Sequence, residues 1–374
     1  MKKILFVSFL AMVWSVHAGS LPAKRPVMGP CVETLLPGGA RGMYCVPEQG
    51  WNGDVIVFAH GYTAATEPLD YQNLTFGEVY LPELVQQLGY AFATTTYRRN
   101  GLAIVEGVED VRELVQAFRA ATGKRAKRFI MTGASEGGIV TVLALERYPH
   151  LFVGGLSMCG PIGNFRFQTD YISDFRLLFD YYFPGVLPGD ALQIPEDMIG
   201  QWFTLHRPAV LQAIRAEPAK TIEMLHVAKA AYDADDWSTV ENTVTEVLWY
   251  HTFGTGDALA KLGGNPYGNT RQTYRGSAND AALNAGVDRF VADAVALRSI
   301  RPYNTTGKVK KPLVILHTLG DEIIPFTHNL IYLAKVNQAG GGNVKMYPVD
   351  RYGHCNFTIN ELIGGLVVLL GELR

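Results

Sequence analysis

The chain contains short, nearly continuous apolar runs that are bounded by glycine, proline or charged residues. Runs of this length and composition are typical of strands that are buried on both faces of a mostly parallel sheet. The pattern predicts strands over residues 42–47, 53–59, 89–97, 129–132, 153–158, 313–317 and 344–349.

A second pattern lies between these runs. Apolar residues recur at spacings of three and four positions, which is the spacing of one face of an α-helix. Strands that alternate with such helices indicate an α/β fold in which helices flank a mostly parallel central sheet. The predicted helices cover residues 80–88, 105–122, 139–146, 323–338 and 360–373.

The alternation stops between Gly160 and Lys311. Both ends of this aromatic-rich stretch enter the same predicted sheet, so we interpret residues 161–310 as a large, mainly helical cap. The core is then formed by residues 19–160 and 311–374, and a separately folding domain is the alternative. Helix-like segments of the cap cover residues 173–183, 209–216, 221–232 and 238–251.

The first eighteen residues have the organisation of a secretory signal peptide. Two lysines follow Met1, an apolar run covers residues 4–14, and small residues precede a cleavage site after Ala18. The run is too short to span a bilayer comfortably, and no later segment reaches ~20 apolar residues. We expect a secreted or periplasmic protein without stable membrane insertion; an uncleaved anchor helix is the alternative.

Charge and cysteine content narrow the function further. The chain has 33 Lys and Arg against 35 Asp and Glu, which gives no electrostatic case for binding nucleic acid. Export makes disulfides the expectation for the four cysteines. Cys31 and Cys45 lie in a predicted opening hairpin, whereas Cys159 and Cys355 both fall at the carboxyl edge of the sheet. We predict these two pairings, and the spacing fits no zinc site.

The strongest local motif is Gly133-Ala134-Ser135-Glu136-Gly137-Gly138. It stands between a predicted strand and a predicted helix, which is the context of a nucleophile elbow. Glycines two positions before and after Ser135 remove the Cβ atoms that would collide in so sharp a turn. The motif predicts Ser135 as a catalytic nucleophile. An ordinary glycine-rich turn with a capping serine is the alternative.

A serine nucleophile needs a base and an acid that orients the base. Asp321 follows the strand at 313–317 and is the best candidate acid. The alternative role for Asp321 is to cap the helix that follows, and Glu322 is the alternative acid. The base is expected after the last strand, where His354 lies. His328 is on the helix after Asp321, too close in sequence to fold back.

Two backbone amides are expected to stabilise the oxyanion. The residue after the nucleophile, Glu136, supplies one from the start of its helix. The loop His60-Gly61-Tyr62-Thr63, which follows the strand at 53–59, supplies the second through Tyr62. We interpret His60 itself as a structural residue beneath this loop.

The elbow, His60-Gly61, Gly320-Asp321 with Pro325, and Gly353-His354 together resemble the α/β-hydrolase superfamily over residues 53–158 and 311–374. The double glycine after the elbow is similar to that of secreted esterases related to the prolyl-oligopeptidase branch, including feruloyl-esterase-like enzymes. The resemblance implies the α/β-hydrolase fold, the triad Ser135, Asp321 and His354, and the oxyanion amides of Tyr62 and Glu136. It does not extend to the cap and implies no substrate.

The sequence therefore predicts a serine hydrolase that cleaves carboxylic esters of small molecules or short oligomers without metal or cofactor. A serine aminopeptidase or oligopeptidase is the second hypothesis, with Asp233, Asp235 and Asp236 holding the substrate's amino terminus. A binding protein with an inactive elbow is the third. The oligomeric state stays open. Candidate substrate contacts in the cap are Phe165, Trp202 and Trp249, for which the cap's own core is the alternative role.

Overall fold

The structure, a computed structural model, describes residues 26–122 and 126–373. The predicted signal peptide, residues 1–18, lies outside this range. Within the described residues, no helix combines the length and the apolar character that crossing a bilayer requires.

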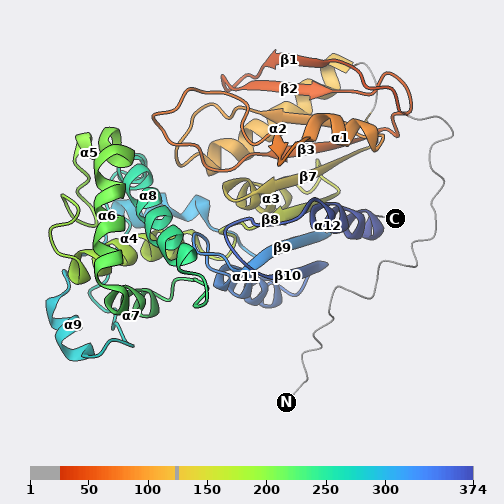
Figure 1. The fold of residues 1–374 in the computed structure, drawn as a ribbon. Helices are drawn as coiled ribbons and strands as arrows, with labels where there is room; N and C mark the ends of the chain where they lie inside the picture. Colours follow the sequence, from red (N-terminus) through yellow and green to blue (C-terminus); the bar gives the residue numbers. More distant parts are fainter. Residues whose placement is uncertain (1–25, 123–125, 374) are drawn as a thin grey trace.

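An eight-stranded sheet forms the centre of the molecule, in the order β1-β2-β6-β3-β7-β8-β9-β10 (Figure 1). The pairs β1–β2 and β2–β6 are antiparallel, and every pair from β6 to β10 is parallel. All seven predicted strands are present. The bounds are β1 (Cys31–Leu35), β2 (Arg41–Cys45), β3 (Asp54–Ala59), β6 (Ala91–Thr95), β7 (Arg128–Ala134), β8 (Gly154–Met158), β9 (Leu313–Gly320) and β10 (Val344–Tyr352), with β4 (Thr75–Phe76) and β5 (Val79–Tyr80) as a separate hairpin.

Helices cover both faces of the sheet. Helices α2 (Ile104–Thr122), α3 (Glu136–Arg147) and α11 (Thr327–Gln338) share one apolar cluster with the strands. Helices α1 (Leu81–Gln87) and α12 (Ile359–Glu372) lie on the opposite face. Successive strand side chains point to opposite faces, so both sets of positions must be apolar, and this produces the continuous apolar runs of the sequence. The predicted fold class, an α/β-hydrolase fold with a mostly parallel central sheet flanked by helices, is confirmed.

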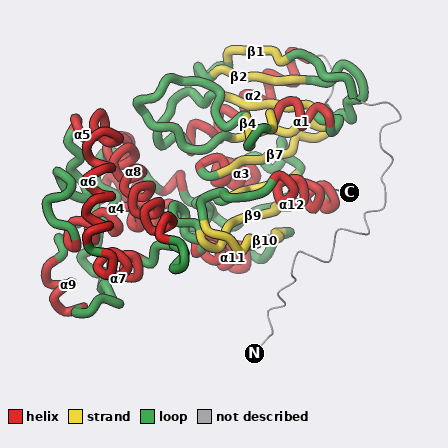
Figure 2. Tube along the Cα trace, viewed as in Figure 1, coloured by secondary structure: helices red, strands yellow, loops and turns green. Residues whose placement is uncertain are grey.

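The chain between β8 and β9 is mainly helical and gathers beside one end of the sheet (Figures 1 and 2). It has an apolar cluster of its own, which Ile323 and Ile324 join from the loop after β9. The helices are α4 (Phe165–Tyr182), α5 (Glu196–Gln201), α6 (Arg207–Ala216), α7 (Pro218–Ala228), α8 (Trp237–Leu262), α9 (Asp280–Gly286) and α10 (Ala294–Ser299), with a π-helical turn at Trp202–His206 and a 3-10 turn at Arg301–Tyr303.

The predicted helix at 221–232 ends earlier in the structure. Helix α7 stops at Ala228 because Lys229 adopts a left-handed backbone with φ of 55°, and its amide bonds back to the last turn. A residue in this conformation commonly closes a helix by satisfying carbonyl groups that have no further intrahelical donor.

Both predicted disulfides are present. Cys31 and Cys45 are directly opposite each other in the β1–β2 hairpin, with a Cα–Cα distance of 4.1 Å. Cys159, just after β8, is joined to Cys355 across 196 residues of sequence, with a Cα–Cα distance of 5.4 Å. The second bridge therefore attaches the residue that follows His354 to the end of β8.

Candidate active site

Ser135 stands in the sharp turn between β7 and α3. Its φ of 57° and ψ of −122° are unusual for a residue with a side chain. A Cβ atom at Gly133 would lie 2.1 Å from the Gly137 carbonyl oxygen, and one at Gly137 would lie 2.0 Å from the Ala59 carbonyl oxygen. The turn can therefore form only with glycine at both positions, as expected for a nucleophile elbow.

The structure brings Ser135, His354 and Asp321 together from loops at the carboxyl ends of β7, β10 and β9. Ser135 Oγ lies 2.9 Å from His354 Nε2 and is placed to donate to it. His354 Nδ1 lies 2.8 Å from Asp321 Oδ2 and 3.0 Å from Oδ1. A nucleophile, a base within hydrogen-bond reach and an acid that orients the base form the arrangement that activates a serine hydroxyl.

Asp321 also shapes its own loop. Its Oδ1 accepts hydrogen bonds from the amides of Ile323 at 3.0 Å and Ile324 at 2.8 Å. These bonds form a turn before Pro325, so helix α11 begins at Thr327 instead of the predicted residue 323. The N-cap of α11 is Phe326, so Asp321 does not have the alternative role of capping that helix.

The alternative acid, Glu322, points elsewhere. Its Oε1 accepts a hydrogen bond from the Asn242 side chain at 3.1 Å, and burial raises the pKa of its carboxyl to about 7. The carboxylate that bonds His354 is that of Asp321.

A second histidine side chain contacts Asp321. His317 lies on β9, is fully buried, and places Nε2 3.1 Å from Asp321 Oδ2 and 2.9 Å from the Ile324 carbonyl oxygen. The sequence reasoning missed this residue. The available signal was its place four residues before Asp321, on the strand that leads to that residue.

The electrostatics of the three groups suit proton transfer. Burial opposes ionisation of Asp321, but the nearby His354 and the hydrogen bonds from His317 and His354 outweigh it and hold the pKa of Asp321 well below its usual range. Burial would lower the pKa of His354, whereas the charge and hydrogen bond of Asp321 raise it above its ordinary value. An ionised Asp321 therefore favours the imidazolium form of His354.

The two residues predicted to supply oxyanion amides, Tyr62 and Glu136, line the helix-walled pocket together with Ser135. The Glu136 amide is the first of helix α3, where no intrahelical acceptor exists and the helix dipole favours negative charge. The Tyr62 amide belongs to the loop after β3. Asn73 orients this loop, because its Oδ1 accepts a hydrogen bond from the Gly61 amide at 3.0 Å. The role of these amides stays a prediction, and Asn73 was not foreseen.

His60 lies beneath the same loop. It is buried, stacks on Tyr97 with ring centroids 3.9 Å apart, and places Nδ1 2.7 Å from the Gly61 carbonyl oxygen. Burial lowers the pKa of His60 to about 4, against the opposing effect of its backbone hydrogen bonds, so the ring is neutral at pH 7. These contacts agree with the structural role that the sequence predicted.

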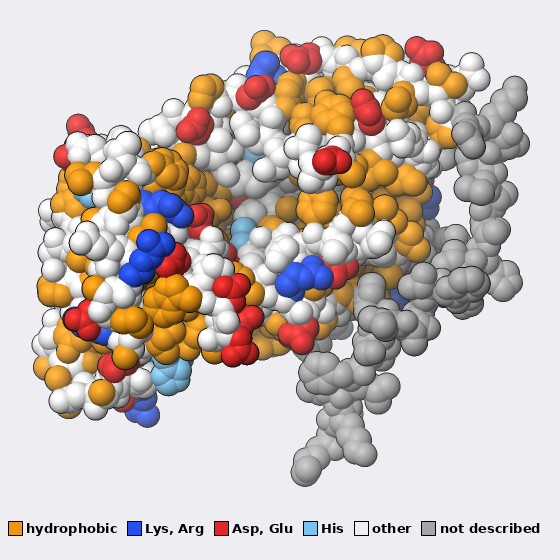
Figure 3. All heavy atoms as spheres, viewed as in Figure 1, with side chains coloured by type: hydrophobic (Ala, Val, Ile, Leu, Met, Phe, Trp, Pro, Cys, Tyr) orange, Lys and Arg blue, Asp and Glu red, His pale blue; other side chains and the backbone are white. Residues whose placement is uncertain are grey.

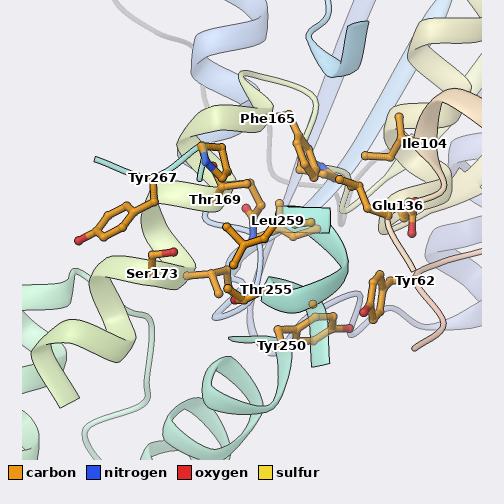
Figure 4. Close-up of a pocket in the computed structure, with 18 of the residues that line it drawn as sticks. Tyr62, Ile104, Glu136, Phe165, Thr169, Ser173, Tyr250, Thr255, Leu259 and Tyr267 are labelled. Atoms are coloured by element: carbon orange, nitrogen blue, oxygen red, sulfur yellow. The ribbon is translucent and has the colours of Figure 1, made fainter. Parts of the chain in front are cut away.

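Two apolar pockets meet at Ser135. The first, which we call the helix pocket, has a volume of about 130 Å³ and is walled by α4 and α8 (Figure 4). The second, which we call the sheet groove, has a volume of about 340 Å³ and lies between α1, α12 and the sheet. Tyr62 and Tyr250 line both pockets, whereas His354 lines only the sheet groove.

The predicted substrate contacts divide between pocket and core. Phe165 lines the helix pocket. Trp202 is only 1% exposed, packs in the core of the helical segment and lines neither pocket, so its alternative role as a core residue is the correct one. Trp249 also lines neither pocket; its ring packs edge-on against Tyr62 at 6.2 Å and stacks on Phe253 at 4.7 Å. It supports the loop that carries Tyr62.

The acidic cluster before α8 is also away from the pockets. Asp236 accepts a hydrogen bond from the Ser238 amide and caps α8, and Asp233 accepts one from the Asp235 amide. Among the residues that the structure describes, none of the three aspartates lines either pocket. The idea that they hold a substrate's amino terminus therefore has no support from their position.

One group of metal-ligating side chains lies close together in the described parts of the chain, namely Cys159, His354 and Cys355. The two thiols are joined in the disulfide, and His354 is engaged with Asp321 and Ser135. The group thus belongs to the candidate active site.

Comparisons with known proteins add the following. No family model and no curated protein matches the sequence. Solved structures that resemble the chain include Pyrococcus horikoshii acylaminoacyl peptidase (16% identity, TM-score 0.45, 89% of this chain and 38% of that one). Another is a Pyrococcus furiosus esterase (12% identity, TM-score 0.46, 93% of this chain and 90% of that one). A third is Porphyromonas gingivalis dipeptidyl peptidase 4 (11% identity, TM-score 0.47, 93% of this chain and 36% of that one). The chain thus spans well under half of the two peptidases, and likeness at this level assigns no function.

Proposed function

We propose that this protein is a serine hydrolase that cleaves carboxylic esters through an acyl-enzyme. The observation that carries the proposal is the hydrogen-bonded series Ser135–His354–Asp321, with Ser135 at the junction of two apolar pockets. The partners that fit such a site are therefore small-molecule esters or short oligomers that carry an ester bond.

The reaction follows from the positions of these groups. Ser135 Oγ attacks the ester carbonyl while His354 Nε2 takes its proton, and Asp321 stabilises the charged imidazole. The amides of Tyr62 and Glu136 hold the oxyanion of the tetrahedral intermediate. His354 then gives the proton to the departing alkoxide oxygen, and the same imidazole activates a water molecule that releases the acid.

The character of the pockets favours esters over peptides. A peptide substrate brings N–H and C=O groups on both sides of the scissile bond, and each one buried without a partner costs about 1–3 kcal/mol. The walls of both pockets are predominantly aliphatic and aromatic. An ester with apolar substituents avoids this cost, and peptidase activity is the second candidate function.

We further propose that the protein is exported and that the helical segment, residues 161–310, acts as a cap on the core formed by residues 19–160 and 311–374. Two disulfides support export, because such bonds persist in oxidising compartments. Helices α4 and α8 support the cap function, because they wall the helix pocket above Ser135.

The direct test is the Ser135→Ala variant with p-nitrophenyl butyrate and with aminoacyl arylamides as parallel substrates. We expect ester turnover to fall more than about a thousandfold. Ser238→Ala, an exposed serine at the start of α8, is the matched control and should keep full activity. Unchanged ester turnover in Ser135→Ala would refute the proposal, and turnover of arylamides alone would favour the peptidase.

A further inference from the structure

The sheet groove is organised as two facing rows of aliphatic side chains. On α1 and the residue after it, Leu81, Leu84, Val85 and Leu88 follow helical spacing, and on α12 Ile359, Leu362, Ile363 and Leu366 do the same. Ile359 and Leu366 are seven residues apart, so this wall extends about 10 Å along the helix. The groove is therefore elongated and apolar over its length.

Few polar side chains line the groove. They are Ser135, His354, Asn73, Thr75, Thr132 and the phenol groups of Tyr62 and Tyr250, and no carboxylate or ammonium group is among its lining residues in the described chain. In Figure 3, hydrophobic side chains gather where α1 and α12 lie in Figure 1, and the surface beside them is hollowed. Apolar surface of this kind gains about 25 cal/mol per Å² when a ligand covers it.

The position of His354 distinguishes the two pockets chemically. After the tetrahedral intermediate forms, the leaving oxygen must lie within hydrogen-bond reach of His354 Nε2 to receive its proton. His354 lines the sheet groove and does not line the helix pocket. The alcohol half of an ester therefore leaves on the side of the groove, and the acyl half faces the helix pocket.

We infer that the sheet groove binds the alkyl chain of the leaving alcohol and that the smaller helix pocket binds a short acyl group. The favoured substrate is then a short-chain acyl ester of a long, uncharged aliphatic alcohol. This inference rests on the proposed ester hydrolase activity and specifies its substrate. An alcohol that carries a phosphate, an ammonium or a sugar finds no matching polar partners in the groove.

The test compares two isomers of equal composition, decyl acetate and ethyl decanoate, with ethyl acetate as the reference. Burying even two methylene groups contributes about tenfold in kcat/KM. We therefore expect the wild-type protein to prefer decyl acetate over both other esters by at least about that factor. Ethyl decanoate places its long chain on the side of the smaller pocket and should gain no comparable advantage.

Matched variants locate the effect. Ile363→Trp fills the groove, whereas Val367→Trp adds the same ring to an exposed position of α12 outside it. The ratio of kcat/KM for decyl acetate to that for ethyl acetate should fall about tenfold in Ile363→Trp and stay unchanged in Val367→Trp. Leu84→Trp on α1 blocks the groove from the other wall and should reproduce the fall.

A second pair probes the helix pocket. A Cβ atom at Gly254 of α8 would meet only Tyr62 Oη, at 3.7 Å, so Gly254→Leu projects into free space of this pocket. Gly256→Leu, at an exposed position of the same helix, is its control. Gly254→Leu should lower the kcat/KM ratio of ethyl butanoate to ethyl acetate, and Gly256→Leu should not.

Three outcomes would overturn the inference while the hydrolase activity stands. These are equal turnover of the two isomers, an unchanged ratio in both groove variants, or a selective loss of ethyl decanoate turnover in Ile363→Trp. A binding measurement does not depend on catalysis. We expect decanol to bind Ser135→Ala directly, and we expect the added Ile363→Trp substitution to weaken that binding. Absence of Ser135-dependent turnover of every ester, ethyl acetate included, would instead refute the proposed function.

Discussion

The side chains of His317 and Asp321 meet in full burial, with His317 Nε2 3.1 Å from Asp321 Oδ2. The same carboxylate bonds His354 and two backbone amides. Because all its partners are donors, Asp321 is held in one position and in its ionised form. Asp321 orients His354 towards Ser135, and His317 in turn holds Asp321. The orientation of His354 thus depends on His317 through Asp321.

Replacing His317 should therefore reduce catalysis through Asp321. His317→Phe removes a donor to a buried carboxylate, which costs about 1.5–3 kcal/mol and corresponds to a fall in kcat/KM of roughly ten- to hundredfold. His317→Gln keeps a donor and should recover part of the loss. Ester kinetics and a pH–rate profile check this. Equal losses in both variants with an unchanged profile would point to a packing effect alone.

The pH dependence of hydrolysis should follow His354. The imidazole must be neutral to accept the Ser135 proton, and the charge and hydrogen bond of Asp321 raise the pKa of His354 above its ordinary value of 6.5. Activity should therefore be lost as pH falls through this raised pKa, so the acid limb of kcat/KM lies above pH 6.5.

Asp321→Asn tests the cause of that limb. Removing the negative charge should move the limb to lower pH and reduce kcat by roughly 10³–10⁴-fold, because the amide no longer favours the imidazolium. A pH–rate profile measured in buffers of constant ionic strength reports both the position of the acid limb and the fall in kcat. An acid limb at the same pH in the variant would contradict the electrostatic role of Asp321.

The Cys159–Cys355 disulfide should matter more for activity than the Cys31–Cys45 disulfide. Cys355 adjoins His354 in sequence, and its Sγ lies 3.5 Å from His354 Nε2. We expect the double variant Cys159→Ala/Cys355→Ala to lose ester turnover even where it is folded, since the loop of His354 loses its attachment to the end of β8.

The matched control is Cys31→Ala/Cys45→Ala, whose bridge closes a hairpin of 14 residues away from the triad. Its loss should lower thermal stability, by about 3 kcal/mol in the chain-entropy description, with kcat preserved in the folded protein. Turnover and thermal unfolding measured together separate the two effects. A larger loss of kcat in Cys31→Ala/Cys45→Ala than in Cys159→Ala/Cys355→Ala would contradict the prediction that the Cys159–Cys355 disulfide matters more for activity.

Glu136 should make stability depend on pH. Burial raises the pKa of its carboxyl from 4.5 to about 8, although the Ala103 amide and Lys261 act in the opposite direction. Between these two pH values the folded protein holds a proton that the unfolded chain releases. The free energy of unfolding should therefore fall as pH rises from 4.5 to 8.

Glu136→Gln removes this dependence and keeps an oxygen for the Ala103 amide, which now bonds Glu136 Oε1 at 2.6 Å. The variant should be more stable than the wild type at pH 9 by on the order of a few kcal/mol. Denaturant unfolding across the pH range measures it. Glu67→Gln, at an exposed position, should leave the curve unchanged.

Local patterns were sufficient for much of the fold and for the central residues of the site. A buried parallel strand requires apolar residues on both faces, so β3, β6 and β9 are legible as continuous runs. The elbow at Ser135 needs glycine at positions where any Cβ would collide with backbone. Asp321 and His354 follow strands of the same sheet, and strand ends at one edge lie together whatever the intervening chain does.

The sequence by itself thus determined seven strands of the sheet, the glycine-bounded turn at Ser135, the order in which Ser135, Asp321 and His354 follow strand ends, and the two cysteine pairs. Only the tertiary structure decided that His317 supports Asp321, that Asn73 orients the Gly61 loop, that Trp202 is core rather than pocket, and that a groove separates α1 from α12. The physical reason is that periodicity shows which side chains turn away from water, but not which other element they meet. That choice depends on contacts between residues far apart in the chain, and those contacts shape the surfaces around Ser135.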